Sequence, residues 1–135
     1  MNTHTDPKLE LLAHVPLFAG LSRHELELVA SASDVLDVDA GLDLTTEGRL
    51  GHEAFILLDG GAAVHRRGEV VNCLEAGAVF GELAVLGGGR RTATVTTTAP
   101  SRVLVFAGHD FRRVVRELPQ VAAGLLPDVA RRVAA

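Results

Sequence analysis

Residues 80–95 bring together the residue types that suit the binding of a phosphate group. A triple glycine in this stretch is followed directly by Arg90 and Arg91. A glycine-flanked turn of small residues lets backbone N–H groups converge on an anion, and guanidinium groups add charge and paired donors. Glu82 lies nine residues before Arg91, so its carboxylate could accept hydrogen bonds from sugar hydroxyls while Arg91 neutralises a phosphate. Together these residues predict a nucleotide ligand.

The glycines alone are weak evidence, because they form neither a G-x-x-x-x-G-K-[ST] loop nor a G-x-G-x-x-G fingerprint. On composition, a flexible turn beside solvated arginines is the competing interpretation. Patterns for catalysis are missing: Leu28 stands where an H-E-x-x-H helix beginning at His24 needs its second histidine, and no serine lies in G-x-S-x-G. We therefore expect no metal site, no resident cofactor and no enzymatic activity.

Charge is distributed unevenly along the 135 residues, whose formal net charge is −4. Residues 1–60 hold three Lys/Arg against eleven Asp/Glu, whereas residues 61–135 hold ten against six. An anionic ligand is thus expected in the second half of the chain. The whole chain lacks the basic excess of a nucleic-acid binder, and nothing in it predicts a helix-turn-helix, so no nucleic acid is expected as its partner.

The elements that must position these residues are mainly strands. Ser22 and Glu25 match a capping box, which predicts a helix over 22–33 after a short apolar segment at 9–15. Apolar residues then lie among aspartates between 35 and 44, and further short apolar runs follow at 54–58, 62–64, 70–74, 92–98 and 102–106. Eleven of the fourteen glycines fall within residues 41–89, and no proline occurs from 17 to 99. This pattern predicts a compact antiparallel barrel or roll.

Helical periodicity returns after residue 108, and Pro119 begins a last apolar stripe. Gly124 and Pro127 interrupt that stripe, so a kink or break is expected near 123–127. The single cysteine, Cys73, excludes an internal disulfide framework, and no apolar run approaches the roughly 18 residues of a membrane span. The expectation is one cytoplasmic domain over residues 1–135 that does not insert into a membrane.

The stretch from Phe80 to Val95 closely resembles the phosphate-binding cassette of cyclic nucleotide-binding domains, whose pattern runs Phe-Gly-Glu-Leu-Ala, a spacer, then Pro-Arg-small-Ala-Thr-Val. The likeness extends over about residues 9 to 134. It implies that Arg91 meets the ligand phosphate and that Glu82 holds the ribose 2′-hydroxyl. Backbone amides of the cassette would also bind the phosphate, which makes the site residues Gly81, Glu82, Leu83, Ala84, Arg90, Arg91 and Thr92. Arg90 replaces the family's proline and would add positive potential at the mouth of the site.

The resemblance also implies a fold and a function. The fold would be an antiparallel, jelly-roll-like β-roll with N-terminal helices and two C-terminal helices. The domain would bind a 3′,5′-cyclic nucleotide, cAMP in preference to cGMP, and act as a non-catalytic sensor by moving its last helix over the base. The Thr92 hydroxyl could accept from a guanine 2-amino group, or Thr92 could simply be a strand residue that also suits cAMP. Arg131 or Arg132, otherwise expected on a solvated helix face, is an alternative contact to the base.

Two further expectations concern assembly. The last helix is too short for a durable coiled coil, so a monomer or weak dimer is expected, and the protein partner is not identified by the sequence. The alternative function is a ligand-independent regulatory or interaction module with the same fold.

Overall fold

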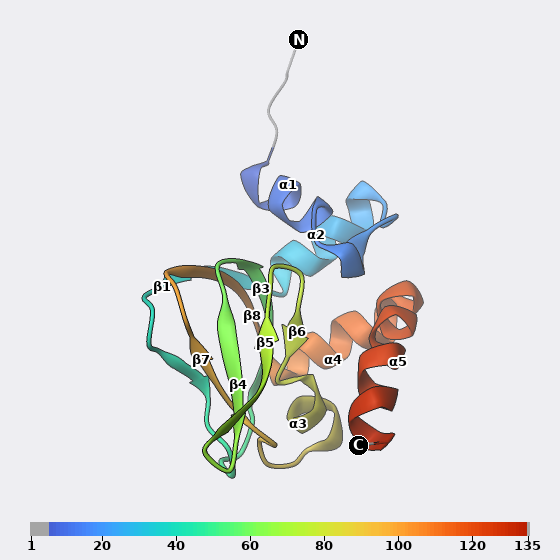
Figure 1. Ribbon diagram of the computed structural model, residues 1–135. Helices are drawn as coiled ribbons and strands as arrows, with labels where there is room; N and C mark the ends of the chain where they lie inside the picture. The colour runs from blue at the N-terminus through green and yellow to red at the C-terminus, as the bar shows by residue number, and fades with distance from the viewer. Residues whose placement is uncertain (1–5, 135) are drawn as a thin grey trace.

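Two antiparallel sheets of four strands each form the centre of the molecule, and the helices gather on one side of them (Figure 1). The computed structural model describes residues 6–134, with the side chains of residues 6–127. One sheet has the strand order β1-β8-β3-β6 and the other the order β2-β7-β4-β5. The predicted β-roll with N-terminal and C-terminal helices is therefore confirmed.

Helical segments begin and end the described chain, and α3 alone interrupts the run of strands between them. The strands are β1 (Asp34–Val38), β2 (Asp43–Thr45), β3 (Glu53–Asp59), β4 (Ala62–Arg66), β5 (Glu69–Leu74), β6 (Val79–Phe80), β7 (Thr94–Thr97) and β8 (Ser101–Ala107). The helices are α1 (Pro7–Ala13), the 3₁₀ turn η1 (Pro16–Phe18), α2 (Arg23–Ser31), α3 (Glu82–Gly87), α4 (Gly108–Glu117) and α5 (Pro119–Ala134). Within this described part of the chain, no helix combines the length and the apolar content that crossing a bilayer requires.

Strand β8 separates two hydrophobic cores with its alternating side chains. Val103 and Val105 face the interior of the roll, whereas Leu104 and Phe106 face the helices. The neighbouring strand β3 alternates in the same way, because successive side chains of a strand point to opposite faces. Both strands are thus buried on both faces, which explains why they read in the sequence as continuous apolar runs rather than as alternating ones.

The first residues of α1 and α2 follow directly on N-cap residues, Asp6 and Ser22, whose side chains accept backbone hydrogen bonds. The Ser22 hydroxyl accepts a hydrogen bond from the Glu25 amide at 3.1 Å, and the Glu25 carboxylate accepts from the Ser22 amide at 2.8 Å. The predicted capping box is therefore confirmed. Helix α1 starts at Pro7, earlier than the apolar segment suggested, because the Asp6 carboxylate accepts from the Lys8 amide at 2.9 Å and proline suits the first helical position.

Helix α3 is an element that the sequence reading missed. The stretch read as a glycine turn contains a six-residue helix between Gly81 and Gly88, whose φ angles are +79° and +67°. Its residues Glu-Leu-Ala-Val-Leu have good helix propensity, and Val85 is buried in the helix-side core. Local propensity and tertiary packing together turn the segment into a helix.

Of the kink or break expected near residues 123–127, the break is wrong, since α5 is one helix from Pro119 to Ala134 with Pro127 inside it, whereas the kink stays a prediction. Buried Val121 and Leu125 hold its first half against the core. A Cβ atom at Gly124 would lie 2.7 Å from Cδ1 of Leu17, so this glycine permits a close approach to η1 rather than ending the helix.

Candidate functional site

A cavity of about 330 Å³ lies between the β2-β7-β4-β5 sheet and the segment that carries α3. Its lining residues come from β2, β4, β5 and the stretch 80–95: Thr45, Val64, Arg66, Val71, Asn72, Leu74, Phe80, Gly81, Leu83, Ala84, Arg91, Thr92, Ala93 and Val95. Arg66 and Arg91 are the charged members of this set, and none of its members is acidic. The cavity therefore suits an anionic ligand with an apolar part.

Arg91 is the most deeply placed charge on the cavity wall, with 8% of its surface exposed. Its Nη1 donates to the Gly81 carbonyl at 2.9 Å and its Nη2 donates to the Glu53 carbonyl at 2.7 Å. Its Cζ lies 5.8 Å from the centre of the Phe55 ring, which stacks on Phe80. Backbone carbonyls and an aromatic ring orient the guanidinium without cancelling its charge, so an anion in the cavity would meet a preorganised cation.

Burial lowers the pKa of the Arg91 guanidinium, and the carboxylates of Glu53 and Glu82 act in the opposite direction. The usual pKa of arginine lies far above neutral pH, so Arg91 stays protonated near neutral pH. With 8% of its surface exposed, the charged form of Arg91 is partly desolvated. A partly desolvated cation gains more from an anionic partner than one in bulk water does.

Glu82 is fully buried at the first position of α3, between Gly81 and Leu83, which both line the cavity. Glutamate is almost never fully buried unless it is paired, and Arg91 donates to the carbonyl of Gly81, the residue directly before Glu82. A carboxylate beside the buried arginine can accept hydrogen bonds from hydroxyl groups of a ligand that enters the cavity.

Gly81 allows this arrangement because its φ of +79° and its lack of a side chain are both required. A Cβ atom there would lie 2.7 Å from Nη1 of Arg91 and 3.1 Å from the Glu53 carbonyl oxygen. Leu83 and Ala84 follow in the first turn of α3 and line the cavity. The N–H groups of a first helical turn have no acceptor within their own helix, so they suit an anion.

The two consecutive arginines point in different directions. Arg91 is buried at the cavity, whereas Arg90 is exposed, donates from Nη1 to the Gly48 carbonyl at 2.9 Å and is not among the lining residues. Thr92 lines the cavity at its exposed rim. Of the seven residues singled out in the sequence, the cavity thus brings together Gly81, Leu83, Ala84, Arg91 and Thr92, with Glu82 buried between the first two in the chain and Arg90 outside.

The β4–β5 hairpin supplies the lining residues that the sequence reading missed. Val64 and Arg66 share one face of β4, and Asn72 and Leu74 share the corresponding face of β5. Their period of two is a signal that could have found them once the two runs were paired as a hairpin. Which face would meet the cavity depends on the packing of the sheet and not on the hairpin alone.

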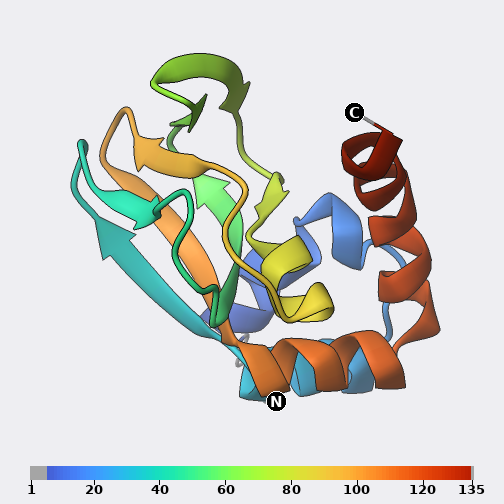
Figure 2. The ribbon, with the colours of Figure 1, turned by 90° about the horizontal axis from the view of Figure 1, so that it is seen from below.

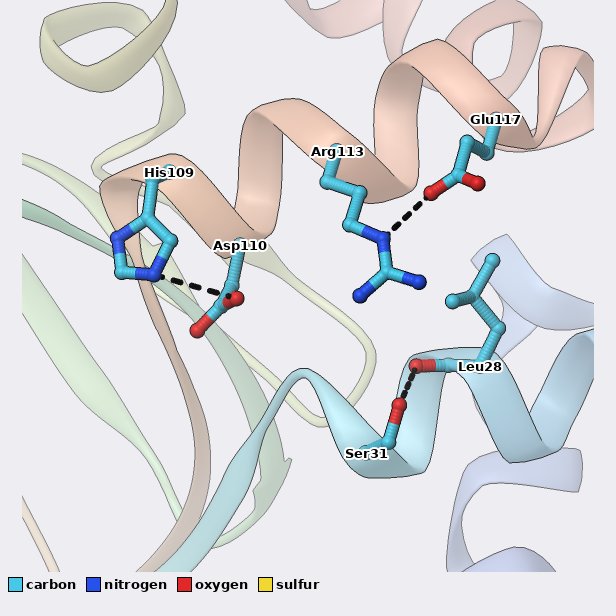
Figure 3. A network of polar contacts seen from close by, with 6 residues as sticks. All are labelled: Leu28, Ser31, His109, Asp110, Arg113 and Glu117. Atoms are coloured by element: carbon cyan, nitrogen blue, oxygen red, sulfur yellow. Dashed lines mark hydrogen bonds and ion pairs between the residues drawn. The ribbon is translucent and has the colours of Figure 1, made fainter.

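The arginines of α4 lie away from the cavity. Arg113 donates from Nε to the Glu117 carboxylate at 2.6 Å, and Nε2 of His109 lies 3.4 Å from the Asp110 carboxylate (Figure 3). Arg112 donates to the Val85 carbonyl at 3.3 Å, across to α3. The side chains of Arg131 and Arg132 lie outside the described ones, so a base contact by either stays a prediction.

A second cavity, of about 450 Å³, lies between α1 and strands β3 and β8. The charged side chains on its wall are exposed, and Arg102 is already paired with Asp37 at 2.8 Å. Nothing comparable to the buried Arg91 faces it. In the described residues there is also no group of three His, Cys, Asp or Glu side chains that could hold a metal ion.

Comparison with known proteins agrees with this geometry. Residues 35–117 match the family model of the cyclic nucleotide-binding domain. The chain is 32% identical over 113 residues to a cAMP-dependent protein kinase regulatory subunit from Eremothecium gossypii, covering 83% of this chain and 25% of that protein. It is 28% identical over 123 residues to the cyclic AMP receptor protein of Thermus thermophilus, covering 87% of this chain and 57% of that protein.

A solved structure shows the same fold. The regulatory domain of Toxoplasma gondii PKA, crystallised with cAMP, superposes with a TM-score of 0.78 at 25% identity, over 93% of this chain and 49% of that one. The chain spans only a quarter to somewhat over half of the curated relatives named above. The match of the family model over most of the roll and α4, together with these relatives, shows that the chain belongs to the cyclic nucleotide-binding domain family.

Proposed function

We propose that this domain binds a 3′,5′-cyclic mononucleotide in the cavity of about 330 Å³. The observation that carries the proposal is the buried guanidinium of Arg91, which is oriented toward the cavity by two backbone carbonyls. The singly charged phosphate of a cyclic nucleotide would pair with Arg91, and its ribose 2′-hydroxyl would donate to Glu82. The purine would then extend toward the apolar residues of the β4–β5 hairpin.

We further propose that cAMP is preferred to cGMP. The names of the relatives support this preference, because they describe a cAMP-dependent protein kinase regulatory subunit and a cyclic AMP receptor protein. These names also describe regulatory proteins rather than enzymes, in keeping with a sensor that leaves its ligand unchanged. No cofactor beyond the nucleotide is part of this proposal.

The signal would be a change in the position of α5. In the described part of α5, up to Pro127, no residue lines the cavity, and the helix packs on η1 through Gly124 and through a hydrogen bond from Gln120 to the Ala19 carbonyl at 2.7 Å. Figure 2 shows α3 between the strands and α5. A ligand bound at α3 would therefore affect α5 through a displacement of α3. Movement of α5 toward the base would report occupancy.

Calorimetric titration with cAMP and cGMP side by side tests this function. The expected result is one site per chain, with the lower Kd for cAMP. Recovery of intact cAMP after prolonged incubation with the protein checks that no hydrolysis occurs. If neither nucleotide binds at millimolar concentration, the ligand-independent interaction module becomes the favoured function.

A further inference from the structure

We propose that Arg66 is the residue through which this domain accepts a guanine base, and that it narrows the preference for cAMP over cGMP. The inference rests on the proposed function, since it concerns the base of a nucleotide whose phosphate meets Arg91. Arg66 lies at the end of β4 and lines the cavity, where it is the second cation beside Arg91.

Arg66 is tethered so that its terminal nitrogens stay available. Its Nε donates to the carbonyl of Thr92 at 3.3 Å, which fixes the side chain beside the rim of the cavity. Nη1 and Nη2 make no hydrogen bond to any of the described residues. Glu69 is the cross-strand neighbour of Arg66, but the ion pairs among the described side chains do not include these two. The guanidinium therefore offers its paired donors to a ligand.

A register shift in the β4–β5 hairpin places a second donor, Asn72, and an exposed apolar side chain, Val71, on the cavity wall that Arg66 also lines. The register of β4 with β5 shifts between Val64 and His65, so that Val64 pairs with Asn72 and His65 with Val70. The residue left between them, Val71, lines the cavity together with its neighbour Asn72, although consecutive strand residues normally face opposite ways. Val71 is 53% exposed, which leaves an apolar surface that a base would cover.

The polar groups that the β4–β5 hairpin offers to the cavity are mainly donors. The Asn72 side-chain oxygen already accepts from the Cys73 amide at 2.8 Å, so its amino group is the part left for a ligand. Arg66 has donors only. Guanine presents two neighbouring acceptors, O6 and N7, which an arginine can bind with both terminal nitrogens, whereas adenine presents the N6 amino donor beside N7. A wall of donors thus favours the O6/N7 edge of guanine and gives adenine no matching pair.

This contribution differs from that of Thr92. The Thr92 hydroxyl can accept from the 2-amino group of guanine, a group on another part of the base. Cyclic inosine monophosphate carries O6 and N7 but lacks the 2-amino group, so it isolates the effect of Arg66. Its affinity should depend on Arg66 and not on the hydroxyl of Thr92.

The experiment compares the Kd values of cAMP, cGMP and cyclic inosine monophosphate for the parent protein, Arg66→Met and Arg67→Met. Arg67→Met is the matched control, because Arg67 is the exposed next residue, does not line the cavity and carries the same charge. Loss of one paired contact to a base corresponds to about 5-fold to 100-fold in discrimination. Arg66→Met should therefore weaken cGMP and cyclic inosine monophosphate about tenfold or more and cAMP less than about threefold. Arg67→Met should leave the ratios of the three Kd values unchanged.

Thr92→Ala separates the two guanine contacts, since it should weaken cGMP more than cyclic inosine monophosphate. An equal loss for all three nucleotides in Arg66→Met would place Arg66 at the phosphate and overturn the inference. Unchanged Kd values in Arg66→Met would overturn it as well, while leaving the proposed function intact. If the parent protein binds none of the three, the proposed function fails and the inference fails with it. Circular dichroism melts of both variants check that they are folded.

Discussion

At the scale of single residues, the neighbours Arg90 and Arg91 offer a test of how much burial matters. Arg91 is partly desolvated and oriented by two carbonyls, whereas Arg90 is exposed and bonded to Gly48. A phosphate paired with Arg91 loses its charge partner in Arg91→Ala, at a cost of roughly 2–5 kcal/mol or at least about 30-fold in Kd. Arg90→Ala also deletes one positive charge, but this charge is exposed to solvent and screened, so the Kd of cAMP should change less than about threefold. Calorimetric titration measures both, and the reverse pattern would exchange the roles of the two arginines.

The role of Glu82 is best tested by changing the ligand rather than the protein. Glu82 is fully buried next to Arg91, so replacing it would disturb the fold as well as the site. A carboxylate that accepts from the ribose 2′-hydroxyl loses this bond with 2′-deoxy-cAMP, which has no hydroxyl at that position. The affinity of the parent protein for 2′-deoxy-cAMP should fall by about 1–3 kcal/mol relative to cAMP. Equal Kd values for the two ligands would remove Glu82 from the binding site.

At the scale of elements, α3 depends on the backbone of Gly81. The φ of +79° alone makes any other residue costly there, and a Cβ atom would also press on Nη1 of Arg91 at 2.7 Å. Gly41 is a matched control, because its φ is +83° and nothing lies within 4 Å of a Cβ atom at that position.

Gly41→Ala should therefore lower the free energy of unfolding by about 1 kcal/mol and leave the Kd of cAMP unchanged. Gly81→Ala should cost more stability and also weaken cAMP about tenfold or more, because the arginine is displaced from its carbonyl partners. Urea denaturation and calorimetric titration of the two variants provide the comparison. Equal binding by both would mean that Arg91 does not need its present position.

At the scale of the whole molecule, β3 and β8 join the two cores. Each strand packs one set of side chains inside the roll and the alternate set against the helices. Arg112 adds a direct link, because it donates to the Val85 carbonyl and so connects α3 to α4. A displacement of α3 by a ligand would therefore also shift α4, and with it α5, which packs on α4.

Hydrogen exchange tests whether α5 responds. This helix is buried at Val121 and Leu125 but has Leu126 63% exposed, so part of its apolar surface is left for a closed position. Saturating cAMP should raise amide protection in residues 119–135 as well as in 80–95. Protection that rises only in 80–95 would show that α5 does not move onto the ligand and that the domain signals through another surface. Arg91→Ala at the same cAMP concentration serves as the control without ligand.

The sequence by itself determined most of the strands, the α2 cap and the resemblance carried by residues 80–95, but not β6, which matches none of the predicted apolar runs. These features depend on residues close together in the chain, such as the capping pair Ser22 and Glu25 and the short apolar runs between glycines. Local periodicity and local hydrogen bonds therefore predict them. The same is true of the cassette, whose candidate residues lie within one segment.

Only the tertiary structure decided which of these side chains share a cavity and which do not. Arg66 and Asn72 reach it because β4 also pairs with β7, a strand far from it in the chain, and because the register of the β4–β5 hairpin shifts beside Val71. Arg91 is held in the buried position by the carbonyls of Gly81 and Glu53, whereas Arg90 donates to the Gly48 carbonyl at the surface. Helix α3 and the unbroken α5 likewise follow from packing of Val85, Val121 and Leu125, which offsets the glycines and proline nearby. Long-range packing offsets local propensity at these positions because each buried Val or Leu side chain contributes about 1.5–3 kcal/mol, against roughly 1 kcal/mol for a glycine and roughly 3 kcal/mol for a proline inside a helix.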